Sequence, residues 1–135
     1  MKQVYLDNAA TTPMSPTVID VITDEMANDF GNASSTHTLG RKARNSVETA
    51  RHTIAQAINA KDQEIIFTSG GSESNNTVIF GVAEMQKAVG RHLITTKIEH
   101  ESVLKSMQHL EELGYEVTYL DVDRDGHISL DQLRE

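Results

Sequence analysis

The first half of the chain carries apolar residues at helical spacing. One stripe recurs every fourth residue, at Val18, Ile22, Met26 and Phe30. Ser15 and Pro16 precede it, and serine caps a helix while proline fits its first turn. The pattern predicts an amphipathic helix from Ser15 to near Gly31. A second stripe predicts a further helix, with apolar positions at Leu39, Ala43, Val47, Ala50, Ile54 and Ala57 or Ile58.

In the second half, short apolar runs alternate with helical stretches. Strands are predicted at residues 64–68, 92–96 and 115–120, and helices at about 74–89 and 101–113. Gly90 and Gly114 follow the helical stretches, where glycine can end a helix. Strands separated by helices of this length form parallel or mixed sheets with right-handed crossovers. The predicted fold class is therefore α/β, with βαβ units that form part of a parallel or mixed sheet.

The amino-acid composition argues against several classes of function. The 135 residues are 38% hydrophobic, and no apolar run approaches the roughly 20 residues that span a bilayer. The polar start MKQVYLDNAATT lacks a signal-peptide core, so we expect a cytoplasmic protein. A formal net charge of -8 argues against nonspecific binding to nucleic acid or anionic membranes. The chain has no cysteine, which excludes disulfides, thiolate metal sites and a cysteine nucleophile within these residues.

Near its end the chain reads DVDRDGHISLDQ, which has features of a calcium-binding loop. Acidic residues occupy loop positions one, three and five, at Asp121, Asp123 and Asp125. The last loop position, however, holds Gln132 in place of the bidentate glutamate, and the preceding residues EVTYL have the alternation of a strand. We therefore expect a polar Asp-Gly turn leading into a helix capped by Ser129, and no metal site.

The segment IIFTSGGSESNN, residues 65–76, is a sharper chemical signal. A predicted buried strand ends at Gly70 and Gly71, and a helix begins among small polar residues. Exposed amides and the positive end of a helix dipole suit a phosphate, and Ser72 adds a hydroxyl donor. Neither GxGxxG nor GxxxxGK[ST] is present, so the usual dinucleotide and P-loop motifs are excluded. From the residues alone, phosphate binding and a plain helix cap remain alternatives.

His100 is a second candidate, because it lies just after a predicted strand and just before a helix. Ligands of open α/β sheets gather at the carboxyl ends of strands, so Gly70 to Ser72 and His100 are expected to face one crevice. A histidine at this position also suits a surface or helix-capping role. Among the other histidines, His37 is of interest because it lies in the polar loop GNASSTH.

Five blocks together carry a resemblance to a known family. They are YLDNAATTP, GNASSTH, FTSGGSESNN, TTKIEHESVL and YEVTYLDVDRDGHISLDQL, which span essentially the whole chain. In order and spacing they resemble the NifS/IscS-like cysteine desulfurases of the class V aminotransferase superfamily. The resemblance implies the large domain of fold-type I enzymes that use pyridoxal 5'-phosphate (PLP). It implies an N-terminal arm at residues 1–14 and the incomplete first half of that domain at residues 15–135.

The resemblance also implies roles for particular residues. Gly71 and Ser72 match the Ala-Thr pair that holds the cofactor phosphate, and both changes keep the amide and the hydroxyl. His100 matches the histidine that stacks on the pyridine ring and assists proton transfer, which implies a catalytic and cofactor-binding role. Further positions match segments on the substrate side of the cleft: Asn8, Ala9, Thr11, Asn32 and His37.

The activity implied by the resemblance is conversion of L-cysteine to L-alanine and a protein persulfide, for iron–sulfur cluster or thio-cofactor assembly. The implied partners are a sulfur acceptor or scaffold protein and a second copy of the chain in a homodimer. The family's Schiff-base lysine and nucleophilic cysteine belong to segments beyond residue 135, so the chain alone is expected to be inactive. The alternatives are selenocysteine cleavage, transamination or, outside enzymes, a calcium-binding module.

Overall fold

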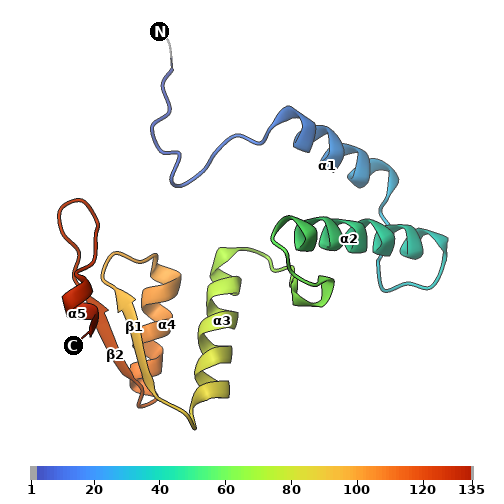
Figure 1. The fold of residues 1–135 in the computed structure, drawn as a ribbon. Coiled ribbons are helices and arrows are strands. Elements are labelled where there is room, and N and C mark those ends of the chain that lie inside the picture. The colour runs from blue at the N-terminus through green and yellow to red at the C-terminus, as the bar shows by residue number, and fades with distance from the viewer. Residues whose placement is uncertain (1–2, 135) are drawn as a thin grey trace. The chain divides into compact units, whose positions relative to one another are not determined.

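The computed structural model describes residues 3–134. The chain divides into two compact units, Met1–Ile66 and Phe67–Glu135 (Figure 1). Among the described residues, no helix is both long enough and apolar enough to cross a membrane.

The first unit contains the two helices that the apolar stripes predict. Helix α1 spans Pro16–Asn28 and helix α2 spans Thr38–Ala57, followed by the short 3₁₀ helix η1 at Asp62–Glu64. Ser15 caps α1 as predicted, because its Oγ accepts the amide N–H of Val18 at 3.4 Å. Helix α1 buries no residue, and its apolar stripe stays exposed, so within the described residues this stripe packs into no core.

The loop before α2 is packed tightly against Gly40. A Cβ built on Gly40 would lie 2.4 Å from the carbonyl oxygen of Ser35 and 2.7 Å from that of Asn32. Gly40 is buried, and its amide donates to Nδ1 of His37, which caps the helix. Glycine is required here for close approach of two backbone segments.

Gly40→Ala in the full-length protein is therefore expected to lower the free energy of unfolding by about 1–3 kcal/mol, the usual cost of overpacking. Gly81→Ala is the matched control, because a Cβ at this helical position meets nothing within 4 Å. The control is expected to raise stability by up to about 1 kcal/mol, since alanine favours helix. Urea denaturation measures both, and equal effects would contradict the packing argument.

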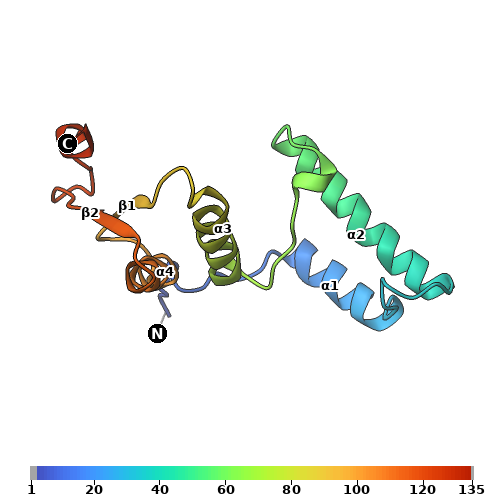
Figure 2. The ribbon, with the colours of Figure 1, turned by 90° about the horizontal axis from the view of Figure 1, so that it is seen from below.

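The second unit is built around a βαβ element. Its helices and strands are α3 (Gly71–Gln86), β1 (His92–Thr96), α4 (Glu101–Glu112), β2 (Glu116–Leu120) and α5 (Leu130–Arg134). Strands β1 and β2 are parallel and in register from His92 opposite Glu116 to Thr96 opposite Leu120. Helix α4 connects them and contacts both β2 and α3 (Figure 2). The predicted α/β class with parallel strands is confirmed.

A small core joins α3, α4 and the start of β2. Ala83, Leu110 and Tyr115 are buried there, and partly buried apolar side chains pack around them at Ile79, Phe80 and Leu93. The Tyr115 hydroxyl donates a 2.8 Å hydrogen bond to the carbonyl of Ala83, which satisfies this buried polar group. The guanidinium of Arg91 lies 5.0 Å from the centre of the Tyr115 ring.

Two element predictions were wrong in detail. Residues 65–68 do not form the predicted strand, and Ile66 and Phe67 are 73% and 47% exposed. A strand needs a hydrogen-bonded neighbour, and the sheet of the described residues contains only β1 and β2. Helix α3 begins at Gly71, earlier than the predicted 74, and ends at Gln86, before 89. The predicted cap of the last helix is confirmed, since Ser129 Oγ accepts an amide N–H of α5.

Candidate functional site

The start of α3 presents unpaired main-chain donors. Among the described residues, the amides of Gly71, Ser72 and Glu73 meet no backbone acceptor, and the first bond of the helix runs from Ser74 to the carbonyl of Gly70 at 3.1 Å. A Cβ at Gly71 would meet nothing within 4 Å, so the backbone there is open to approach. These are the donors that an anion at a helix N-terminus uses.

Glu73 braces the turn that leads into α3. Its Oε2 accepts the amide N–H of Ser69 at 2.6 Å and the hydroxyl of the same serine at 2.7 Å. These bonds, first that from the side chain of Ser69 and then that from its amide, hold the pKa of Glu73 below its ordinary value. The carboxylate is therefore charged at neutral pH and fixes the loop beside Gly70.

His100 begins α4 and is tied to α3 through a serine. Its Nδ1 accepts the amide N–H of Ser102 at 3.1 Å, which caps the helix. Ser102 Oγ lies 2.9 Å from the same nitrogen, and Asn75 of α3 donates to that Oγ at 2.9 Å. One turn further along α4, the buried Ser106 donates to Asn76 Oδ1 at 2.5 Å. These two polar contacts add to the apolar core in joining α3 to α4.

Ser72 and His100 line one groove between α3 and α4. Its volume is about 450 Å³, and the lining comprises Ser72, Asn76, Phe80, His100, Glu101, Ser102, Lys105 and Ser106. The structure thus brings two of the predicted site residues together. Gly71 adjoins Ser72 in the chain but is not part of the lining. The roles assigned to Gly71, Ser72 and His100 stay predictions, whereas the shared groove is an observed feature.

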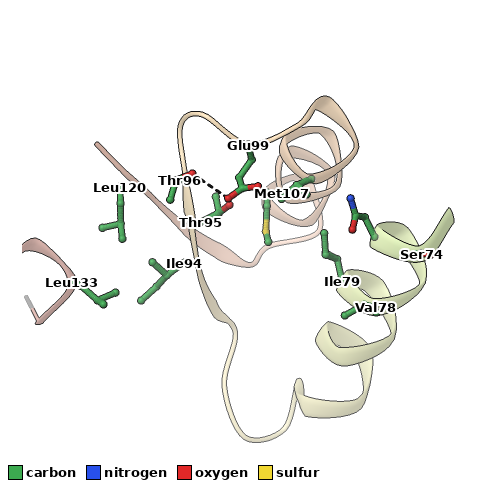
Figure 3. A pocket seen from close by; sticks show the side chains of 12 residues that line it. Ser74, Val78, Ile79, Ile94, Thr95, Thr96, Glu99, Met107, Leu120 and Leu133 are labelled. Atoms are coloured by element: carbon green, nitrogen blue, oxygen red, sulfur yellow. Dashed lines mark hydrogen bonds between the residues drawn. The ribbon is translucent and has the colours of Figure 1, made fainter. Parts of the chain in front are cut away.

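A larger cavity of about 570 Å³ shares no lining residue with this groove and contains none of the predicted site residues. Figure 3 shows apolar side chains of α3, such as Val78 and Ile79, together with Ile94 of β1 around it. Thr96 donates to Glu99 at its rim with a 3.1 Å bond. The cavity extends to Leu120 of β2, and its lining is mainly apolar.

The substrate-side candidates lie in the other unit. Asn8 sits in a turn, and the Tyr5 hydroxyl is 2.5 Å from Thr11 Oγ1. Asn32 Oδ1 accepts both the amide and the hydroxyl of Ser34, each at 2.9 Å. His37 is the cap of α2, so the structure gives Asn32 and His37 local roles in holding the loop. Their substrate-side roles stay predictions.

Comparison with models of known protein families identifies the family of this chain. The model described as "Aminotransferase class-V" matches residues 4–135. The chain belongs to the class-V aminotransferase family.

Individual relatives of this class-V aminotransferase chain carry more specific names. It is 49% identical over 135 residues to "Putative cysteine desulfurase IscS 1" of Bacillus subtilis, covering 100% of the chain and 36% of that protein. It is 50% identical over 134 residues to "Cysteine desulfurase IscS" of Dictyoglomus turgidum, covering 99% of the chain and 34% of that protein. The chain thus spans about a third of the length of these relatives.

Solved structures confirm the fold. A structure called "NifS-like protein" superposes with a TM-score of 0.91 at 36% identity, over 98% of this chain and 36% of that one. A second, "SspA in complex with cysteine", gives a TM-score of 0.82 at 40% identity, over 93% of this chain and 36% of that one. These matches confirm the expected resemblance to fold-type I enzymes.

The aspartate-rich loop of this class-V aminotransferase chain is a turn built around one carboxylate. Asp123 Oδ1 accepts the amides of Asp125 and His127, both at 2.9 Å, and Gly126 has a φ of 86°, which favours glycine. The preceding element is β2, so the prediction of a strand before an Asp-Gly turn is confirmed. Within residues 3–134, no group of three or more potential metal ligands gathers.

Asp123→Ala is expected to speed hydrogen exchange at the amides of Asp125 and His127. Amide bonds favour the charged carboxylate, and they hold the pKa of Asp123 below its ordinary value, the His127 amide being the largest cause. The contribution of the Asp123 carboxylate to the stability of the turn is present above its unfolded pKa of about 3.9. It is lost as the pH falls through the lower pKa of the folded state. NMR measurement of the hydrogen-exchange rates of the Asp125 and His127 amides, in the parent and in Asp123→Ala at several pH values, tests this expectation.

Asp125→Ala is the control for this turn, because that carboxylate contacts the exposed Arg124 at 3.4 Å and accepts no amide from residues 3–134. Its exchange rates are expected to match those of the parent. If both aspartate variants exchange alike, the carboxylate of Asp123 does not hold the turn.

Proposed function

We propose that this chain is the N-terminal part of a PLP-dependent cysteine desulfurase. The proposed reaction converts L-cysteine to L-alanine and a protein persulfide, whose sulfur serves iron–sulfur cluster or thio-cofactor assembly. The observation that carries the proposal is the groove that Ser72 and His100 share at the open start of α3. Relatives about half identical to the chain and named cysteine desulfurase support the same reading.

The start of α3 and the groove beside it fit the phosphate of PLP. The unpaired amides of Gly71 and Ser72 lie at the positive end of a helix of 16 residues, where an anion is stabilised. Lys105 adds a positive charge to the lining. Gly71 and Ser72 would hold the phosphate, and His100 would border the ring. When bound, PLP supplies an electron sink for the carbanion chemistry of amino acids.

The groups that carry out the remaining steps of the proposed reaction are assigned to parts of the protein outside residues 1–135. The chain contains no cysteine, so the thiol that receives the sulfur must come from elsewhere in the protein. Large apolar side chains are also exposed, with Leu6 at 89%, Met85 at 80% and Val89 at 86%. Apolar surface of this kind needs cover from the remainder of the polypeptide or from a second copy. This surface supports the proposal of a homodimer, and we propose in addition that the protein is cytoplasmic and passes sulfur to an acceptor protein.

Product analysis of the full-length protein with L-cysteine tests the function. The expected products are alanine and an enzyme-bound persulfide in equal amounts. Release of pyruvate or another oxo acid, or turnover of selenocysteine with none of cysteine, would overturn the desulfurase assignment in favour of another class-V reaction.

Ser72→Ala is expected to weaken PLP binding by about 10- to 100-fold, the worth of one hydrogen bond to a charged group. The amides of the helix start remain, so binding is reduced and not abolished. Absorbance titration of the apoprotein with PLP measures the dissociation constant. The control is Ser46→Ala, at an exposed serine of α2, and an equal loss in both variants would argue against a phosphate contact at Ser72.

A further inference from the structure

The contacts of His100 determine which ring nitrogen carries the proton. Both hydrogen bonds between the ring and the described residues reach Nδ1. One comes from the amide of Ser102 at 3.1 Å, and a main-chain N–H can only donate. Nδ1 is therefore an acceptor, and in the neutral ring the proton lies on Nε2.

The hydroxyl of Ser102 completes the same pattern. Because Nδ1 accepts, Ser102 Oγ, at 2.9 Å, must donate its proton to it. The oxygen then has free lone pairs, and Asn75 Nδ2 donates to it at 2.9 Å. The donors run in one direction, from Asn75 on α3 through Ser102 to His100 on α4.

We propose that Ser102, held by Asn75, is a positioning residue that keeps neutral His100 in the tautomer with its proton on Nε2. The lone pair of Nδ1 is engaged by two donors, while Nε2 carries the available N–H. In its neutral form His100 thus donates a hydrogen bond or a proton at Nε2 and does not act as a base there. This consequence for catalysis rests on the proposed function, in which His100 borders the reacting groove.

Nitrogen NMR of the full-length protein with ¹⁵N-labelled histidine, free of cofactor and substrate, tests the proposal. The shifts of Nδ1 and Nε2 report the tautomer, and His100→Asn identifies the signals of His100. The parent is expected to show an unprotonated Nδ1. Ser102→Ala is expected to raise the ratio of the Nδ1–H to the Nε2–H tautomer about fivefold, the worth of one ordinary hydrogen bond. Asn75→Ala should change the ratio in the same direction and less.

Two variants separate positioning from general packing. Ser102→Thr restores the hydroxyl and is expected to return the ratio to that of the parent. Ser106→Ala removes the bond to Asn76 and a bond to the main-chain carbonyl of Ser102, but it leaves both hydrogen bonds of the His100 ring in place, so the ratio should stay unchanged. A protonated Nδ1 in the parent, or an unchanged ratio in Ser102→Ala, would overturn the proposal.

The kinetic readout distinguishes this proposal from the proposed function. If the protein releases alanine from cysteine, Ser102→Ala should lower kcat more than it changes KM, with recovery in Ser102→Thr. Absence of desulfurase activity in the parent overturns the function but leaves the tautomer result standing. If the enzyme is active but the tautomer ratio of His100 is the same in Ser102→Ala as in the parent, only the positioning role is overturned.

Discussion

His100→Asn in the full-length protein is expected to lower kcat for alanine formation by about 10²- to 10⁴-fold, the usual contribution of a positioned proton donor or acceptor. The ring of His100 borders the groove at the start of α3, so its loss removes the imidazole from the proposed site. Asparagine is chosen because it is a strong N-cap and can replace Nδ1 as acceptor for the amide of Ser102. Helix α4 should therefore stay capped in His100→Asn, while kcat for alanine formation falls.

His100→Ala separates the two roles of this side chain. It is expected to lose the same activity and also about 0.5–2 kcal/mol of stability, because alanine cannot cap α4. His52→Asn is the control for general effects of losing a histidine, since His52 contacts Asp62 at 3.1 Å in the other unit. Steady-state rates and denaturant unfolding measure both quantities. Activity of His100→Asn within about threefold of the parent would show that the ring does not take part.

Leu110→Ala is expected to lower the free energy of unfolding by about 2–5 kcal/mol, the measured range for large-to-small changes in cores. Leu110 is only 2% exposed and packs with Ala83 and Tyr115, where α4 meets α3 and β2. Truncation removes apolar contacts and leaves a cavity that the surrounding helices fill only in part.

Leu113→Ala is the matched control, because this leucine lies at the end of the same helix and is 55% exposed. Its expected cost is within about 1 kcal/mol, since a partly exposed side chain loses little on truncation. Denaturant unfolding of the full-length protein compares the two. Equal costs would mean that the core around Leu110 does not stabilise the unit.

Helices α1, α2 and α4 were predictable because the signals that specify them are local. Each carries a repeat of apolar positions spaced three or four residues apart, and in α1 and α4 a glycine follows the helix within a few residues of its end. The run at 64–68 was predicted wrongly as a strand for the converse reason. Its apolar composition suits a strand, but the sheet of the described residues contains only β1 and β2, so the run does not join a strand ladder.

The candidate site was predictable in part. Gly71, Ser72 and His100 were found from residue type and from their places at the ends of predicted elements, and the structure places Ser72 and His100 on one groove. Asn75 and Ser102 were missed. A signal existed, since Ser102 and Ser106 are four residues apart and share one face of α4. Which residues of α3 they meet depends on how the two helices are rotated, and periodicity does not specify that.

Short-range hydrogen bonding and side-chain periodicity specify the α/β class, the main helices, the Asp-Gly turn and the residues that resemble a phosphate site, so these features could be predicted from the chain alone. The packed structure alone supplies the register in which β1 and β2 pair, and it alone shows that Ser72 but not Gly71 lines the groove with His100 and that Asn75 holds His100 through Ser102. These features depend on contacts between residues distant in the chain. Such contacts arise only when the helices and strands pack and their side chains take fixed orientations.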